Sequence, residues 1–277
     1  MAYVDLVSTG LTPVAGGATY NFSYDTPISA DGSPHLTHIG FQINATLAGA
    51  GAFNSTIGRL INNMRIKIGA NTILDFNDPF TNTDAITPSN LSVLAQKVRG
   101  VDMISLTGTE DGKSFVGELA LPFGLDASRS HRVNFSITLG SETTWCGQAF
   151  TVAATEFNVV NYYGTSSDST LYGSRQDFTL TNGSERAITV FGKQSWQMLG
   201  VSMINDADAD QVSQIRVNNG AFRALTIQQW RVLDGTYSDG IRTLVGGETA
   251  IPAWTLRRVG YVFLDLKRLT AGADISM

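Results

Sequence analysis

The sequence predicts an all-β chain built as two copies of one antiparallel sandwich, each with a single short helix. Three observations predict it: apolar and polar residues alternate in many short runs, turn signals separate these runs, and one local plan occurs twice. Many short strands joined by tight turns are typical of sandwiches and barrels. The chain has 277 residues, which is enough for two domains of roughly 130 residues each.

The strands are predicted from alternation with a period of two residues. The clearest run is 133–139, where Val133, Phe135, Ile137 and Leu139 are separated by polar residues. Similar sets are Tyr20, Phe22 and Tyr24; Met64, Ile66 and Ile68; Leu119, Leu121 and Phe123; and Val262, Leu264 and Leu266. The turn signals between them are Asp31-Gly32, Asp111-Gly112, Asn182-Gly183, Asn219-Gly220 and Asp239-Gly240.

Two helices are predicted, one in each half. In the first, Thr87 is the cap, Pro88 occupies the first helical position and Gly100 ends the helix. Its apolar face consists of Leu91, Leu94, Ala95 and Val98. The second helix is shorter and follows Thr226, with Ile227, Trp230 and Leu233 on one face and Gly235 beyond its end.

The two halves repeat one order of elements. Ile39-Gly40-Phe41 corresponds to Leu199-Gly200-Val201, and the strand at Arg65 corresponds to the strand at Arg216, each followed by a turn and a helix. The offset between the halves falls from 160 (199 − 39) to 151 (216 − 65) and then to 139 (226 − 87). The first half therefore carries extra residues in 45–59 and in 75–86, both rich in Gly, Asn and Thr as surface loops are.

We expect the domain boundary near 163–176, where the Gly- and Ser-rich segment 164–169 is typical of a linker. Residues 1–163 would form the N-terminal sandwich and residues 164–277 the C-terminal one. The offsets explain why the first half is the longer of the two.

The composition limits which partners the chain can bind and in which compartment it is made. The chain has 24 acidic and 19 basic residues, only 16% charged residues and no basic tail, so we expect no direct, sequence-specific nucleic-acid binding. Cys146 is the only cysteine, which excludes an intrachain disulfide and a thiolate zinc cluster. The start of the chain does not read as a signal peptide, and no stretch approaches 18 apolar residues. We therefore expect synthesis in a reducing host cytoplasm.

The sequence contains no catalytic signature, so we expect no enzyme activity, no cofactor and no metal. Walker, Gly-x-Ser-x-Gly and Gly-x-Gly-x-x-Gly motifs are absent. The pair His35 and His38 would point to opposite faces of a regular strand. The acidic run Asp206–Asp210 resembles the start of a calcium loop, but Gln211 stands where the turn glycine belongs and Val217 where the bidentate Glu belongs.

Two residue types leave alternatives open. The six glutamates could place two carboxylates in one cleft, although nothing in the sequence selects such a pair. The four tryptophans could form a sugar-binding platform, but packing in the core or at a subunit interface is the favoured reading. These tryptophans are Trp145, Trp196, Trp230 and Trp254.

The repeated plan resembles the major capsid proteins of the double jelly-roll viral lineage. Within that lineage it is most similar to the small members from tailless icosahedral bacteriophages with an internal membrane, of the corticovirus and finnlakevirus type. The likeness covers roughly residues 15–268 and is one of order, length and apolar pattern. The segments that carry it are Ile39–Ile43, the hairpin at Asn63–Ile68 with its capped helix, the same plan at Gln214–Val217 with Trp230, and the closing strand Tyr261–Leu266.

The resemblance implies two tandem eight-stranded antiparallel jelly-roll sandwiches, each with one short helix. It further implies a homotrimer of pseudo-hexagonal outline that tiles an icosahedral virion shell, with longer loops directed outward. Expected partners are other copies of the chain, penton, spike and minor capsid proteins, and an internal membrane. The resemblance carries over no catalytic, cofactor or metal residues.

Two other classes of protein compete with this expectation. A phage spike or lectin-like jelly roll would bind host glycans at a concave aromatic site and would not self-associate extensively. A glycan-active enzyme on a sandwich scaffold would place two carboxylates about 5–10 Å apart in a cleft. The duplication and the low charge favour the shell protein, because large lateral contacts bury ordinary polar and apolar surface.

Overall fold

The structure is a computed structural model. It describes residues 3–14, 18–53, 55–77, 90–98, 100–107 and 112–165, and beyond them only short strands. The chain divides into two compact units: residues 1–175 with 242–249, and residues 176–241 with 250–277. The described residues are mostly strand, so the prediction of an all-β chain is confirmed.

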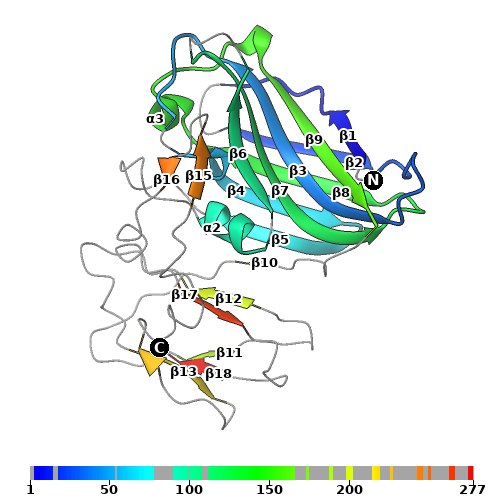
Figure 1. Cartoon of the computed structure of the whole chain (residues 1–277), viewed down its shortest axis with the longest axis vertical. Coiled ribbons are helices and arrows are strands. Elements are labelled where there is room, and N and C mark those ends of the chain that lie inside the picture. Colours follow the sequence, from blue (N-terminus) through cyan, green and yellow to red (C-terminus); the bar gives the residue numbers. More distant parts are fainter. Residues whose placement is uncertain are drawn as a thin grey trace. The chain divides into compact units, whose positions relative to one another are not determined.

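Unit 1 is a sandwich of two sheets (Figure 1). One sheet has the order β1-β9-β3-β7-β6, and the other has the order β5-β4-β8-β2. The strands are β1 (Tyr3–Ser8), β2 (Thr19–Asp25), β3 (His35–Thr46), β4 (Ile61–Ile68), β5 (Asn71–Asn77), β6 (Val101–Leu106), β7 (Ser114–Asp126), β8 (Arg132–Leu139) and β9 (Glu156–Gly164). Three short strands extend these sheets: β10 (Gly173–Ser174) beside β5, β15 (Arg242–Val245) beside β6, and β16 (Thr249–Ala250) next to β15.

The strand pairing of unit 1 is that of a jelly roll. Apart from β6, the outermost strands in the chain pair with each other and the pairs nest inward: β1 with β9, β2 with β8, β3 with β7, and β4 with β5, all antiparallel. The two sheets arise because β9 also pairs with β3 and β8 with β4. An eight-stranded double-sheet roll of this kind is the jelly-roll architecture, so the predicted first jelly roll is confirmed.

Alternation along the strands builds the core between the sheets. In β8, Val133, Phe135, Ile137 and Leu139 are all buried, as the sequence predicts. Phe22 from β2 stacks on Phe135, with ring centroids 4.9 Å apart. The predicted strands at β2, β4 and β7 are confirmed as well. The sheet β5-β4-β8-β2 therefore buries one face, and the polar residues between its core residues face outward.

The predicted first helix is confirmed as α2 (Asn90–Lys97). Leu91 and Ala95 are fully buried, and Leu94 and Val98 pack against the core. The Gly100 amide donates to the Ala95 carbonyl at 2.6 Å, which ends the helix at the predicted residue. The expected cap, Thr87-Pro88, lies outside the described residues.

Several elements of unit 1 are not predicted by the sequence patterns. They are the strands β1, β6 and β9, and the short helices α1 (Ile57–Leu60), α3 (Glu142–Cys146) and η1 (Val152–Ala154). A single helical turn is too short to show a period of 3.6 residues. The signal for α3 is its caps: the Thr144 amide donates to Ser141 Oγ, and Gly147 has a φ of 78°.

The described strands of the second half repeat two pairings of the first. β12 (Met198–Val201), which contains Leu199-Gly200-Val201, pairs antiparallel with the closing strand β17 (Val262–Asp265), as β3 pairs with β9. β13 (Gln214–Asn218) pairs antiparallel with β14 (Leu225–Thr226), as β4 pairs with β5. A further strand, β18 (Asp274–Ser276), lies between β11 (Ala187–Thr189) and β13. The helix expected after Thr226 and most of the second sandwich lie outside the described residues.

Neighbouring residues of β8 offer a test of this arrangement. Ile137→Ala removes a buried side chain and should lower the free energy of unfolding by about 2–5 kcal/mol. Ser136→Ala, one residue away on the outer face, should change it by no more than about 0.5 kcal/mol. Urea denaturation of both variants measures the difference, and similar costs at the two positions would contradict the register of β8.

Candidate functional site

The connections of unit 1 form a longer and a shorter set, and each set lies at one end of the sandwich. The set that is longer in total is 9–18, 47–60, 78–100, 107–113 and 140–155, and the shorter set is 26–34, 69–70 and 127–131. Antiparallel strands alternate in direction, so the connections after β1, β3, β5, β6 and β8 meet at one end. Both extra segments that the repeat predicts in the first half therefore belong to connections of the longer set.

Four aromatic rings pack against one another and link the longer connections. Phe53 lies 5.0 Å from Phe115 and 5.5 Å from Trp145, measured between ring centroids, and Phe150 lies 6.3 Å from Phe115. The indole Nε1 of Trp145 also donates to the Thr56 carbonyl at 3.2 Å. Trp145 is thus a buried packing residue, as the favoured reading predicts, and it is not part of a sugar platform.

A half-buried carboxylate joins two of these connections. Asp102 on β6 accepts a hydrogen bond from Thr56 Oγ1 at 2.6 Å and another from the Gly58 amide, at the start of α1, at 2.9 Å. The Ser92 hydroxyl of α2 also bonds to Asp102 and lies 3.2 Å from Thr56 Oγ1. Burial raises the pKa of Asp102, although all three hydrogen bonds favour its charged form. Asp102 therefore holds α1 and α2 in place from the inner side of β6.

The outer face of the sheet β1-β9-β3-β7-β6 carries a second polar cluster. The Tyr162 hydroxyl donates to Glu118, and Gln42 Nε2 lies 3.5 Å from the other carboxylate oxygen. Two effects raise the pKa of Tyr162 well above its ordinary value. The larger is the burial of its hydroxyl, and the smaller is the nearby Glu118 carboxylate. Gly40 lies between the strands of Tyr162 and Glu118, and a Cβ there would lie 2.8 Å from that of Ala120.

His35 and His38 share this outer face, which corrects the expectation that they point to opposite faces. The register shifts between Leu36 and His38, where β3 has one extra residue relative to β9 and β7 has one extra residue relative to β3. Leu36 and Ile39 both lie in the core. His35 and His38 each precede one of these core residues and therefore both face outward. Even so, the described part of the chain holds no group of three or more His, Cys, Asp or Glu side chains that could bind a metal ion.

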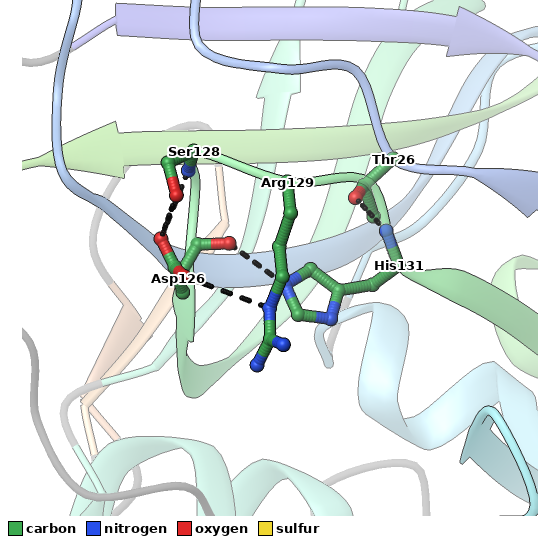
Figure 2. A network of polar contacts seen from close by, with 5 residues as sticks. All are labelled: Thr26, Asp126, Ser128, Arg129 and His131. Atoms are coloured by element: carbon green, nitrogen blue, oxygen red, sulfur yellow. Dashed lines mark hydrogen bonds and ion pairs between the residues drawn. The ribbon is translucent and has the colours of Figure 1, made fainter.

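The third histidine belongs to a turn at the end with the shorter connections (Figure 2). Asp126 Oδ1 accepts from the Ser128 amide at 3.0 Å and from its hydroxyl at 2.7 Å. Arg129 Nε lies 3.6 Å from Asp126 Oδ2, and His131 Nε2 lies 2.7 Å from the Asp126 carbonyl. The Ser128 bonds lower the pKa of Asp126. These contacts lie within the turn and stabilise it.

A small surface depression lies between α1 and α3. It is lined by Arg59, Thr144 and Trp145 among others and has room for about one water molecule. No helix in the described ranges is long and apolar enough to cross a membrane. Cys146 is buried and forms no disulfide.

Several residues considered from the sequence lie outside the described ranges. They are Asp206–Asp210, Trp196, Trp230, Trp254, Glu110, Glu185 and Glu248. Of the remaining glutamates, Glu118 is engaged by Tyr162 and Gln42.

Comparison with known proteins found similar solved structures but no sequence family. Neither a family model nor a curated protein sequence matches the chain. The STIV MCP superposes with a TM-score of 0.44 and 10% identity, over 100% of this chain and 94% of that chain. The PBCV-1 virus capsid gives 0.41 and 11%, over 100% and 84%, and the Sputnik virophage gives 0.35 and 8%, over 99% and 80%. Likeness at this level does not assign a function.

Asp102 gives a test of how the longer connections are held. Asp102→Ala leaves the buried Gly58 amide without its acceptor and should lower the free energy of unfolding by about 1–3 kcal/mol. Asp102→Asn keeps an acceptor and is neutral at every pH. Since the folded-state pKa of Asp102 is raised, its contribution to stability is full below the unfolded pKa and is lost as the pH rises through the folded pKa.

Wild type should therefore gain stability over Asp102→Asn as the pH is lowered from 7 into the acid range. Urea denaturation of both proteins at each pH measures the difference, in which the other carboxylates cancel. A constant difference, or one that favours Asp102→Asn increasingly as the pH falls, would show that burial does not dominate at Asp102.

Proposed function

We propose that the protein is a structural major capsid protein of a virus. The observation that carries the proposal is the nested strand pairing of unit 1, together with the recurrence of two of its pairings in the second half. Jelly rolls occur in viral capsid proteins, lectins and cupins. Two copies in one chain favour the capsid protein, since a lectin or a hydrolase rarely needs two nearly equal lobes.

In this proposal residues 1–163 and 164–277 form two jelly rolls, and three chains form a trimer. Three copies of two similar lobes place six nearly equivalent lobes around a three-fold axis. This gives a pseudo-hexagonal block that can tile an icosahedral shell. The chain's role is then structural, and its place is the virion.

The ends of the sandwich favour one orientation in the shell. Tyr3 pairs with Tyr163, and His35 with Gly164, so the N-terminal strand begins at the end with the shorter connections (Figure 1). The longer connections lie at the other end, where the aromatic cluster and Asp102 hold residues 47–60. We propose that this end faces outward, toward penton and spike proteins, and that the chain start faces the interior.

The particular kind of virus is part of the same proposal. The apolar pattern of the chain resembles that of the major capsid proteins of tailless bacteriophages with an internal membrane. Its net charge of −5 is poorly suited to a surface that lines DNA. A membrane or other proteins would then lie beneath the shell.

The native mass of the purified protein in solution tests the proposal. We expect a stable species near 89 kDa, three times the 29.7 kDa of the chain. Light scattering coupled to size exclusion measures it over a range of concentrations. A monomer at every accessible concentration would contradict the capsid role and favour a spike or lectin-like protein, for which glycan binding would be the next measurement.

A further inference from the structure

Two of the four sheet edges in the unit 1 sandwich carry an added strand, and two do not. β15 pairs with the outer edge of β6, and β10 pairs with the outer edge of β5. No strand pairs with the outer edge of β1 or of β2 in the part of the chain that the structure describes. An unpaired edge presents a row of backbone donors and acceptors to which another strand can bond.

The backbone of β1 bonds to β9 only at alternate residues. The Thr9 amide donates to the Phe157 carbonyl at 3.2 Å and continues the register of β1 with β9. Hydrogen-bonded pairs alternate along antiparallel strands, so the odd-numbered residues of β1 bond to β9. The amides and carbonyls that point to the unpaired edge are those of Val4, Leu6 and Ser8.

The side chains of β1 also favour an added strand. Val4 and Leu6 are 50% and 54% exposed. Residues 3–8 contain no Lys, Arg or Pro, which often protect an edge strand. Asp5 points inward, where its charge acts on Tyr24, and it does not cover the edge.

β2, the other unpaired edge, differs from β1 in its exposed side chains. Those of β2 are all polar: Thr19, Asn21, Ser23 and Asp25. A strand added beside β1 would remove apolar surface from water, whereas one beside β2 would not. β1 is therefore the edge at which strand addition gains both backbone bonds and apolar burial.

The later part of the chain supplies the strands on the two occupied edges. β10 consists of residues 173–174 and β15 of residues 242–245, both in the second half of the sequence. In a ring of alternating lobes, each first-half sandwich would lie beside the second half of its own chain and that of a neighbouring copy. The neighbouring second half is then the part of the assembly that can reach an edge that the chain itself leaves open.

We propose that β1 bonds through its backbone to an extended segment from the second half, residues 164–277, of a neighbouring copy. Main-chain hydrogen bonds would give the contact its affinity, and apolar side chains at alternate positions of the added strand would cover Val4 and Leu6. This inference rests on the proposed capsid function, because only the ring brings the two parts together.

Amide hydrogen exchange on the intact wild-type protein tests the pairing. In the trimer, the amides of Val4, Leu6 and Ser8 should exchange at least about ten-fold more slowly than in monomer obtained by dilution or in mild urea, because each gains a hydrogen bond. The amides of Asp5 and Val7 are internal controls, since they bond to β9 in both states. Mass spectrometry with fragmentation to single residues measures the rates, and the native mass is measured on the same samples.

A matched pair of variants separates the backbone from the side chain. Leu6→Pro removes one donor at the unpaired edge and leaves the bonds to β9, whereas Leu6→Ala shortens the side chain and keeps the donor. Leu6→Pro should raise the concentration at which the trimer dissociates about ten-fold above that of Leu6→Ala. Urea denaturation checks that both variants fold.

Photo-crosslinking identifies the occupant of the edge. Cys146 is the only native cysteine and is buried, so a benzophenone maleimide reacts with the introduced thiol of Leu6→Cys. Irradiation of the trimer should link this position to residues 164–277 of another copy. Ile28→Cys is the control, because Ile28 is 60% exposed in the connection 26–34, away from β1, and should give few links between chains.

The results that would overturn the inference are distinguishable from a failure of the capsid role. A trimer in which the Val4, Leu6 and Ser8 amides exchange as fast as in the monomer would reject the pairing and leave the capsid role standing. So would equal assembly of Leu6→Pro and Leu6→Ala, or links from position 6 only to residues 1–163 or within one chain. A monomeric wild-type protein would reject the capsid role and, with it, the contact between copies.

Discussion

The antiparallel pairing of β3 with both β7 and β9 is the constraint on which the sandwich depends. β3 is a central strand of its sheet, and its inward residues Ile39, Phe41 and Ile43 are fully buried. Because side chains alternate with a period of two, a slip by one residue would expose these residues and bury the polar ones. The register shifts after Leu36, at the start of the strand, and Leu36 also lies in the core.

The same register arranges the outer face. Gly40 lacks a side chain where Ala120 approaches closely, and Tyr162 and Glu118, on the two flanking strands, meet across β3. The hydrogen bond between them joins the strands on either side of β3.

The sequence predicts the elements that show strict alternation or a capped helical stripe. β2, β4, β8 and α2 are of this kind. β9 is not, because Asn161 faces the interior in the place of an apolar residue, so the pattern breaks within the strand. Alternation also cannot reveal the bulge in β3, since an extra residue leaves both flanking runs looking regular.

The polar sites are less predictable, because they join residues far apart in the chain. Asp102 meets Thr56 and Gly58 from another connection, and Tyr162 meets Glu118 from another strand. A charge inside an apolar run, as at Glu118, signals that some partner exists. Only the strand order identifies that partner.

The position of the extra residues bears on why the chain contains the plan twice. Sheet pairing does not tolerate an insertion without a bulge or a change of face, whereas connections at the end of a sandwich tolerate length. The additional residues in 45–59 and 75–86 of the first half belong to connections at the same end. Two lobes can thus differ at the end proposed to face outward while they keep the pairings β3 with β9 and β12 with β17. In a ring of alternating lobes, the lateral faces would then remain nearly equivalent, and the exposed end would be free to distinguish the two.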